Sequence, residues 1–350
     1  ADVIILCLPT PLLKNKNPDM SSLFNAAKKI SPFLCRGKII ILESTVYPGA
    51  TLDLIKKLNL KNLKIGKDIF VSYSPERENP GDKSFNYQKT PKLVSGYSKK
   101  CLEVSKKLYS LIVKRVIPTR SIEIAETSKL LEYLYRSVNI GLVNEFKIIC
   151  SKLKIDVEED LSAAATKNFG FQRINPGPGM GGHCIPIDPY YLSWASNKKG
   201  YLPKFIKTSG DINYLIPKWI VSEIIKFFKL KNIKFSNKRI LLIGISYKKN
   251  ISDDRESPAF TLIKILKKFK ISFDYFDPYF DKISKGRNFS DDKRSIRLNS
   301  KNIKKYLGTL IVTDHDNIDY DLICKNSNYV FDTRGRLKKL KKKYTNIISL

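Results

Sequence analysis

Short apolar segments alternate with amphipathic ones along this chain. The first half contains five brief apolar runs, at residues 1–8, 38–43, 69–72, 93–95 and 115–117. Helical periodicity separates them, most clearly over 21–34 and 99–112. The first run is nearly continuous and stops at prolines, which is typical of a strand buried on both faces of a parallel sheet. The alternation predicts an α/β fold with a doubly wound sheet.

The same alternation returns in the last third of the chain. Residues 121–153 have a long helical period without proline, and further helical segments reach residue 230. Strand signals then follow at 238–244, 271–276, 309–312 and 329–331, with a helix at 260–269. We therefore predict two α/β domains joined by a long central helix. The α/β domains are residues 1–120 and 233–350, and residues 121–232 form a central helical domain.

The charge balance is strongly basic. Among 350 residues, 64 are Lys or Arg and 33 are Asp or Glu, a net charge of +31. Such an excess suggests nucleic acid, anionic lipid or small anions as partners. No nucleic-acid-binding signature is visible, and no apolar run approaches the roughly 18 residues of a membrane span. Because the excess is spread through segments such as 226–238, we predict neither nucleic acid nor a membrane as partner.

Cysteine and histidine usage argues against a metal site. The two histidines are His183 and His315, and no CxxC pair occurs. We predict no metal, free thiols and a cytoplasmic location. The six single cysteines are Cys7, Cys35, Cys101, Cys150, Cys184 and Cys324.

The segment NPGPGMGGHCIPIDPYY, residues 175–191, is the densest chemical signal. Four of the 17 glycines fall within 177–182, and glycine permits close approach of a backbone to a ligand. Asp188 follows Cys184 by four residues, so a helix starting there would place carboxylate and thiol in one site. A helix N-terminus would favour the nucleophilic thiolate. The alternative is a structural turn with a buried cysteine.

Other candidates lie just past predicted strands or on the central helix. Thr45 is a catalytic hydroxyl or a helix cap. Glu76 is a general base or the partner of Arg77. Lys129 stabilises an oxyanion or is one exposed lysine among many. A basic loop after strand 240–244 suits phosphate binding, but no GxGxxG fingerprint follows a strand.

Together these motifs resemble the UDP-glucose/GDP-mannose dehydrogenase family, most closely its UDP-N-acetylglucosamine 6-dehydrogenase branch. The resemblance covers essentially the whole chain, and residues 176–192 are its most specific part. The other motifs are LPTP (8–11), ESTV (43–46), SPER (74–77), NPG (79–81), AE (125–126) with Lys129, VNE (143–145), SYK (246–248), RESP (255–258), DP (277–278), TDH (313–315) and DTR (332–334).

The resemblance implies an activity and its residues. Such an enzyme oxidises the C6 alcohol of a UDP-sugar to the uronate with NAD, through a cysteine thiohemiacetal and thioester, for surface polysaccharide synthesis. Cys184 would be the nucleophile, Glu76 the base for hydrolysis and Lys129 the oxyanion stabiliser, while Thr45 and Asp188 would position water and protons. Implied cofactor contacts are Pro9, Thr10, Thr45, Glu76 and Arg255. Implied UDP-sugar contacts are Arg173, Gly179, Gly181, Gly182, Lys248 and Arg334.

Two departures from the family pattern bear on activity. Tyr133 stands where the family has an asparagine at the oxyanion site, so we expect impaired thioester chemistry. The chain also starts near the fourth strand of the NAD domain, which leaves that Rossmann-like domain incomplete by on the order of 60 to 80 residues. We therefore expect an N-terminally truncated copy. A non-catalytic remnant that keeps UDP-sugar binding or the homodimer interface of the central helix is the alternative function.

Overall fold

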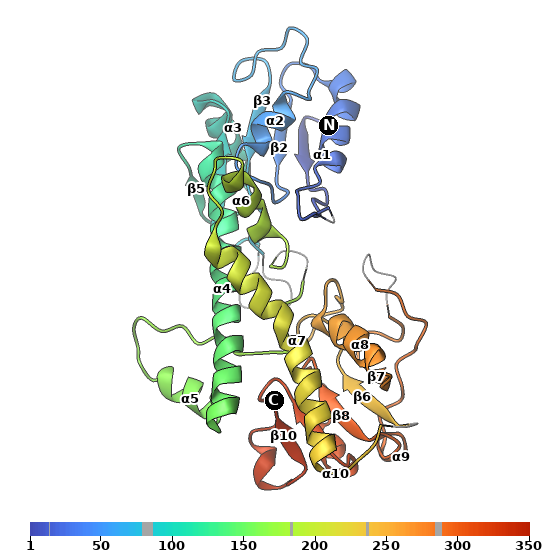
Figure 1. Ribbon diagram of the computed structural model, residues 1–350. Coiled ribbons are helices and arrows are strands. Elements are labelled where there is room, and N and C mark those ends of the chain that lie inside the picture. Colours follow the sequence, from blue (N-terminus) through green and yellow to red (C-terminus); the bar gives the residue numbers. More distant parts are fainter. Residues whose placement is uncertain (14, 79–86, 183–184, 236–237, 284–288) are drawn as a thin grey trace. The chain divides into compact units, whose positions relative to one another are not determined.

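The computed structural model describes residues 1–13, 15–78, 87–182, 185–235, 238–283 and 289–350 (Figure 1). The chain forms two compact units, residues 1–135 with 187–206 and residues 136–186 with 207–350. The helices α4 (Ile122–Leu153) and α7 (Lys204–Leu230) each contribute to both units. The predicted three-domain division stays a prediction, because each of the two compact units combines one sheet with part of the helical residues.

The first unit is built on a five-stranded sheet in the order β1-β2-β3-β4-β5. Helices α1, α2 and α3 connect or follow its strands, and Leu23, Ile40 and Leu54 are fully buried in its core. The elements are β1 (Val3–Leu6), α1 (Ser21–Ile30), β2 (Ile39–Leu42), α2 (Ala50–Ile55), β3 (Phe70–Tyr73), β4 (Lys92–Gly96), α3 (Lys99–Ser110), β5 (Val116–Pro118) and α6 (Asp188–Asn197).

Two features of this sheet differ from the sequence prediction. Strand β1 pairs with β2 at one end of the sheet, and Ile5 is 44% exposed, so its predicted burial on both faces is wrong. No strand among the described residues lies on the outer side of β1, which is therefore an edge strand of this sheet. Strand β4 runs antiparallel to β3. An antiparallel neighbour needs no crossover helix, and the described part of the connection between these strands contains none.

The second unit contains a wholly parallel sheet in the order β10-β9-β8-β6-β7. Its first strand, β6, lies between β7 and β8, so successive strands are added on opposite sides of β6, and the carboxyl end of β6 is a topological switch point. The elements are α5 (Val157–Ala164), β6 (Arg239–Ile243), α8 (Pro258–Lys268), β7 (Ser272–Phe276), α9 (Ser300–Ile303), β8 (Gly308–Ile311), α10 (Tyr320–Asn326), β9 (Val330–Asp332) and β10 (Ile347–Ser349).

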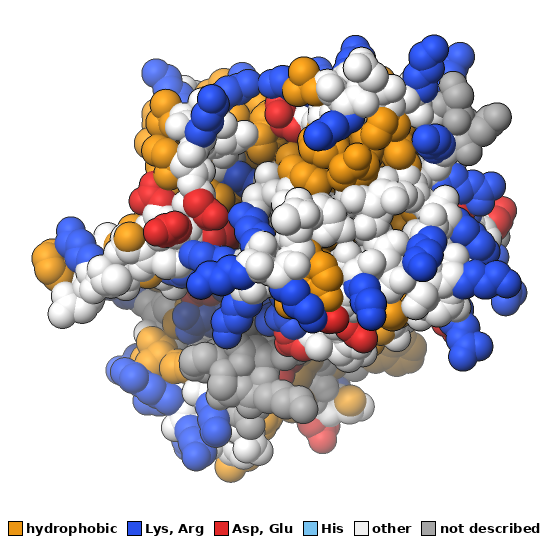
Figure 2. All heavy atoms as spheres, turned by 90° about the horizontal axis from the view of Figure 1, so that it is seen from below, with side chains coloured by type: hydrophobic (Ala, Val, Ile, Leu, Met, Phe, Trp, Pro, Cys, Tyr) orange, Lys and Arg blue, Asp and Glu red, His pale blue; other side chains and the backbone are white. Residues whose placement is uncertain are grey.

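The face shown in Figure 2 agrees with the predicted dispersal of positive charge. Figure 2 shows Lys and Arg side chains scattered over the face in view, interleaved with apolar and acidic ones, instead of gathered in one patch. Some helices reach the length of a membrane span, which also requires an apolar sequence. None of those within the described residues is both long and apolar enough to cross a bilayer.

Candidate functional site

In the first unit, the loops after β1 and β2 meet. The Ser44 hydroxyl accepts a hydrogen bond from Leu8 N and donates to Leu8 O, both at 2.8 Å. The Thr10 hydroxyl donates to the main-chain oxygen of Thr45 at 2.7 Å. Tyr191 of α6 in turn donates to Thr10 O. Thr10 and Thr45 are therefore in direct contact, and Pro9 lies on the same loop.

The helix-cap alternative for Thr45 does not hold. The cap of α2 is Gly49, in the left-handed conformation. The carboxylate of Glu126, from α4, accepts from Gly49 N at 2.6 Å and from Thr51 N at 2.9 Å. Burial raises the pKa of Glu126, while these hydrogen bonds act in the opposite direction. Glu126 thus caps α2 from the central helix, which leaves Thr45 outside the capping contacts.

Lys129 and Glu76 are brought together. Lys129 is buried, with 3% exposure, and its ammonium donates to the main-chain oxygen of Glu76. It also lies 3.0 Å from the hydroxyl of Tyr133, one turn further along α4. The alternative of an exposed lysine is therefore wrong. Tyr133 therefore contacts the predicted oxyanion stabiliser directly.

Glu76 does not pair with Arg77, the simpler alternative. The Arg77 guanidinium contacts Glu132 at 2.7 Å. One Glu76 oxygen accepts from the main-chain N–H groups of Arg77 and Glu78, both at 2.6 Å. Its other oxygen lies 3.4 Å from the ammonium of Lys92. The side chain is partly exposed, so it keeps access to solvent, as a base for hydrolysis requires.

A buried charge cluster that sequence reasoning missed lies beside Glu76. Lys92 is 3% exposed and contacts Glu43 at 2.9 Å. Although burial opposes its charge, Glu43 and Glu76 raise the pKa of Lys92. Desolvation and the neighbouring Glu43 raise the pKa of the Cys7 thiol to about 11, so Cys7 is a neutral thiol at neutral pH. No pattern in the sequence indicates that these side chains lie together, because they are far apart along the chain.

The predicted nucleophile, Cys184, lies outside the described residues. Asp188 is the first residue of α6 and is 2% exposed, so the helix begins at the carboxylate. That this carboxylate shares a site with the Cys184 thiol stays a prediction. Tyr73, fully buried at the end of β3, has its pKa raised first by burial and then by Glu126 and Asp188. The Asp188 carboxylate therefore lies near the carboxyl edge of the first sheet.

In the second unit, the glycine-rich loop packs against the loop that follows β6. A Cβ on Gly181 would lie 2.9 Å from Pro258 and from Tyr247. Gly182 has φ +91°, and a Cβ there would meet the Tyr247 ring at 2.9 Å. Gly179 also has positive φ, +133°. These glycines are needed for close approach to protein, in addition to any ligand.

Gly177 joins this loop to the predicted substrate residue Arg334. A Cβ on Gly177 would lie 2.4 Å from the Arg334 guanidinium. The main-chain N–H of Gly177 donates to Asn144 of α4 at 2.9 Å. Asn144 also donates to Asn213 of α7 at 2.9 Å. Two helices thus hold the loop against Arg334, and neither asparagine had been assigned a role from the sequence.

The remaining predicted contacts lie on loops of the same unit. Arg173 is held by Glu158 at 3.1 Å. Arg255 is held by the Asp253 carboxylate at 2.6 Å, while its main-chain oxygen accepts from Gly182 N at 3.1 Å. Lys248 is half-buried after β6. The sheet edge gathers these residues, but their roles stay predictions.

A further buried pair supports the carboxyl edge of the second sheet. One oxygen of Asp277 accepts from Ile245 N at 2.7 Å and lies 3.2 Å from His315 Nε2. Burial opposes ionisation, but hydrogen bonding to His315 and to main-chain N–H groups lowers the pKa of Asp277. The other His315 nitrogen accepts from Asn250 N at 2.9 Å. This pair fixes the loop that carries Lys248.

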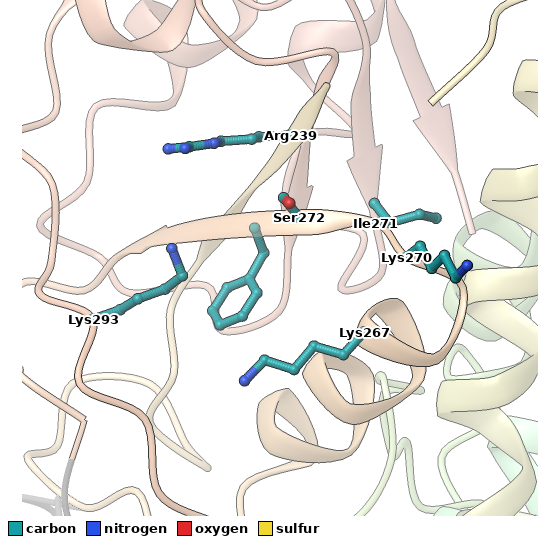
Figure 3. A pocket seen from close by; sticks show the side chains of 7 residues that line it. Arg239, Lys267, Lys270, Ile271, Ser272 and Lys293 are labelled. Atoms are coloured by element: carbon teal, nitrogen blue, oxygen red, sulfur yellow. The ribbon is translucent and has the colours of Figure 1, made fainter. Parts of the chain in front are cut away.

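The opposite edge of that sheet carries a basic hollow of about 240 Å³ (Figure 3). Arg239 and Ser272 begin strands β6 and β7, and Lys267 and Lys293 flank them. Arg239 contacts Asp274 at 3.1 Å, Lys293 contacts Asp274 at 2.9 Å, and Lys267 contacts Asp291 at 2.7 Å. These cations already have carboxylate partners, so the hollow is not the predicted substrate site.

Comparison with known sequences identifies the family. Three domains of the UDP-glucose/GDP-mannose dehydrogenase family match this chain in order. The NAD binding domain matches residues 1–113, the central domain 123–214 and the UDP binding domain 241–339. The matches cover most strands of both sheets, nearly all of α4 and all of α6, while β5 and β10 lie outside them.

Individual relatives agree with this assignment. Protein CapL of Staphylococcus aureus is 35% identical over 345 residues, which cover 96% of this chain and 80% of CapL. The UDP-N-acetyl-D-glucosamine 6-dehydrogenase of Pseudomonas aeruginosa is 36% identical over 283 residues, 79% of this chain and 66% of the relative. This chain thus spans about two thirds to four fifths of their lengths.

A solved structure confirms the fold. The UDP-D-ManNAc dehydrogenase of Pyrococcus horikoshii matches with a TM-score of 0.87 and 30% identity, over 100% of this chain and 80% of that one. The predictions of an α/β fold with Rossmann-type domains, of an oxidoreductase and of NAD as cofactor are confirmed at the level of the family. The chain belongs to the UDP-glucose/GDP-mannose dehydrogenase family.

Proposed function

We propose that this chain oxidises the C6 alcohol of a UDP-sugar, UDP-N-acetylglucosamine, to the carboxylate. The contact of the buried Lys129 ammonium with the Glu76 main chain carries the proposal, since it gathers a cation and a carboxylate-bearing residue at the carboxyl edge of the first sheet. Two molecules of NAD, bound one after the other, would each accept one hydride. Pro9, Thr10, Thr45 and Glu76 follow strands β1 to β3, an edge that suits a nucleotide.

The protein's own groups would act in sequence on the C6 carbon. The Cys184 thiolate adds to the aldehyde that the first oxidation leaves, and the resulting hemithioacetal is oxidised to a thioester. Lys129 stabilises the oxyanion formed when water attacks that thioester. Glu76 takes the proton from water, and the carboxylate product leaves with Cys184 restored as a thiolate.

The test is turnover of the purified chain with UDP-N-acetylglucosamine and NAD. We expect two NADH for each uronate, measured by absorbance and by mass spectrometry of the product. Cys184→Ala should form no uronate, whereas Cys35→Ala, which changes an exposed cysteine, should retain activity. Absence of NADH with UDP-N-acetylglucosamine, UDP-N-acetylmannosamine and UDP-glucose alike would contradict the proposed activity. A higher kcat/KM for UDP-N-acetylmannosamine would reassign the substrate.

We also propose a homodimer through α4. Six exposed apolar residues on this helix are spaced by seven, four, seven, seven and four residues, which places them on one face. An exposed apolar stripe of this length is typical of an interface. The six are Ile124, Leu131, Tyr135, Leu142, Ile149 and Leu153.

Light scattering on the purified protein tests the homodimer. We expect a dimer for the natural chain and a monomer for Leu142→Glu, since a carboxylate in a symmetric interface meets its own copy. Leu111→Glu, at an 85% exposed position outside α4, is the control and should remain dimeric. A monomeric natural chain would refute the interface.

A further inference from the structure

Lys147 is a buried cation without an obvious structural reason. It lies on α4 with 3% exposure, and its ammonium donates to the main-chain oxygen of Thr333 at 3.0 Å. The ring of Trp219 lies 6.0 Å away. Burying an ammonium against a neutral carbonyl is unfavourable compared with leaving it in water or giving it an apolar replacement. Such a group is retained where it holds something in place.

Thr333 belongs to the turn that presents Arg334. The Asp332 carboxylate accepts from Arg334 N at 2.9 Å and from Leu337 N at 2.7 Å. The Thr333 hydroxyl donates to Ile311 O at 2.7 Å. These bonds tie the turn to its own sheet. The bond from Lys147 to the Thr333 carbonyl ties it to α4 as well.

The same helix holds the glycine-rich loop. Asn144 precedes Lys147 by three residues and therefore shares its face of α4. It accepts from Gly177 N at 2.9 Å, and Gly177 packs against the Arg334 guanidinium. Two neighbouring side chains of one helix thus fix the two segments that meet at Arg334.

The charged groups that face Lys147 are already engaged. Asp332 holds its own turn, Glu158 contacts Arg173 at 3.1 Å, and Arg334 donates to Val312 O at 2.8 Å. Burial lowers the pKa of Lys147 to about 7, Asp332 and Glu158 oppose the shift, and Arg334 adds to it. Charged or neutral, the amine can donate to Thr333 O. Asp156, Lys154 and Lys341 also line the adjoining cavity of about 280 Å³.

We propose that Lys147 is a positioning residue for nucleotide-sugar binding, acting through the Thr333 carbonyl on the orientation of Arg334. The inference rests on the proposed function and on the predicted contact of Arg334 with the UDP-sugar. Because Lys147 holds a binding residue and does not touch the reacting carbon, its loss should weaken binding and leave the chemical step unchanged.

The experiment measures UDP binding by calorimetry and, separately, KM and kcat. Lys147→Met should weaken UDP binding and raise KM by about 5- to 10-fold, the effect of one typical hydrogen bond, with kcat within about twofold. Lys147→Arg should recover most of the affinity, since the adjoining cavity admits a longer side chain. Lys152→Met, an exposed site on the same helix, should behave as the natural chain.

The outcomes separate this inference from the proposed function. Natural-chain affinity in folded Lys147→Met, or a loss of kcat with KM unchanged, would overturn the positioning role. If the methionine variant does not fold, Lys147→Gln replaces it: its shorter side chain cannot reach Thr333, so undiminished UDP affinity in that variant would equally overturn the role. Failure of the natural chain to bind UDP would instead refute the proposed function itself.

Discussion

The two edges of the second sheet treat positive charge in opposite ways. At the amino edge, Arg239, Lys267 and Lys293 are half-exposed and contact carboxylates within 3.1 Å. At the carboxyl edge, Lys147 is buried and donates to a main-chain carbonyl. Arg334 is largely buried, also donates to a main-chain carbonyl, and lies 4.0 Å from the Asp314 carboxylate. A half-exposed cation with a carboxylate partner gains little from a further anion. A buried cation such as Lys147, whose hydrogen-bond partner is a neutral carbonyl, gains much more.

An anion-binding surface of a basic protein is recognised by the state of its cations. In a chain of net charge +31, the number of lysines on a surface does not identify that surface as an anion-binding site. Burial and the type of partner do identify a candidate surface. They distinguish exposed cations in close ion pairs from buried cations that donate to main-chain carbonyls. Predictions on Arg334, Lys147 and Arg239 test this difference between the edges, and a prediction on Gly182 tests the loop beside them.

The largest effect is expected for Arg334→Ala. Removing the guanidinium should weaken UDP binding by about 10- to 100-fold, because a charged hydrogen-bonding group at the carboxyl edge is lost. Calorimetry with UDP measures the change. Unaltered UDP affinity would mean that the carboxyl edge does not bind the nucleotide, and the contrast between the edges would then have no functional meaning.

The glycine-rich loop gives the next effect. Gly182→Ala should lower the free energy of unfolding by about 1 to 3 kcal/mol, because a Cβ there combines positive φ with contact on the Tyr247 ring. Gly170→Ala has a similar φ of +69° but open space around it, so chemical denaturation should show a smaller loss. Equal losses would assign the whole effect to φ and none to packing.

The third prediction concerns pH. The pKa of Lys147, lowered by burial to about 7, lies below the ordinary value of a lysine. Between these values the unfolded chain binds the extra proton, so stability rises with pH above 7, by up to about 1.4 kcal/mol per pH unit. Relative to Lys147→Met, the natural chain should therefore become more stable from pH 7 to pH 10. A constant difference in denaturation midpoint would show that Lys147 stays charged.

The smallest effect is expected at the amino edge. Arg239→Ala should change stability by less than about 0.5 kcal/mol and leave UDP affinity as it is, since its partner Asp274 keeps Lys293 and Tyr306. Thermal denaturation and the same calorimetry measure both. A loss of UDP affinity comparable with that of Arg334→Ala would erase the distinction between the two edges.

Much of the fold could be predicted because the signals are local. The strand predicted at 238–244 is observed at Arg239–Ile243, and the helix predicted at 121–153 at Ile122–Leu153. Apolar runs and helical periods depend on neighbouring residues. Strand β10 (Ile347–Ser349) was missed, because three residues after a lysine-rich segment give no alternation to detect.

The site could be predicted only in part. The motifs supplied Lys129, Glu76, Thr10 and Thr45, and the structure places these in two contacting pairs. The Glu43–Lys92 pair was missed as a cluster, because Glu43 follows β2 while Lys92 begins β4. The hydrogen bond between Asp277 and His315 joins residues 38 apart. Pairing over such separations has no signature in a single sequence.

The sequence by itself determined the fold class, the family and the order of the site motifs, since each of these is written in local patterns and spacings. Only the tertiary structure decided which cations are neutralised. Lys147 and Lys267 are the same residue type on helices, yet one meets the carbonyl of Thr333 and the other the carboxylate of Asp291. The difference arises from burial and from partners brought together by folding, and both are properties of the packed chain.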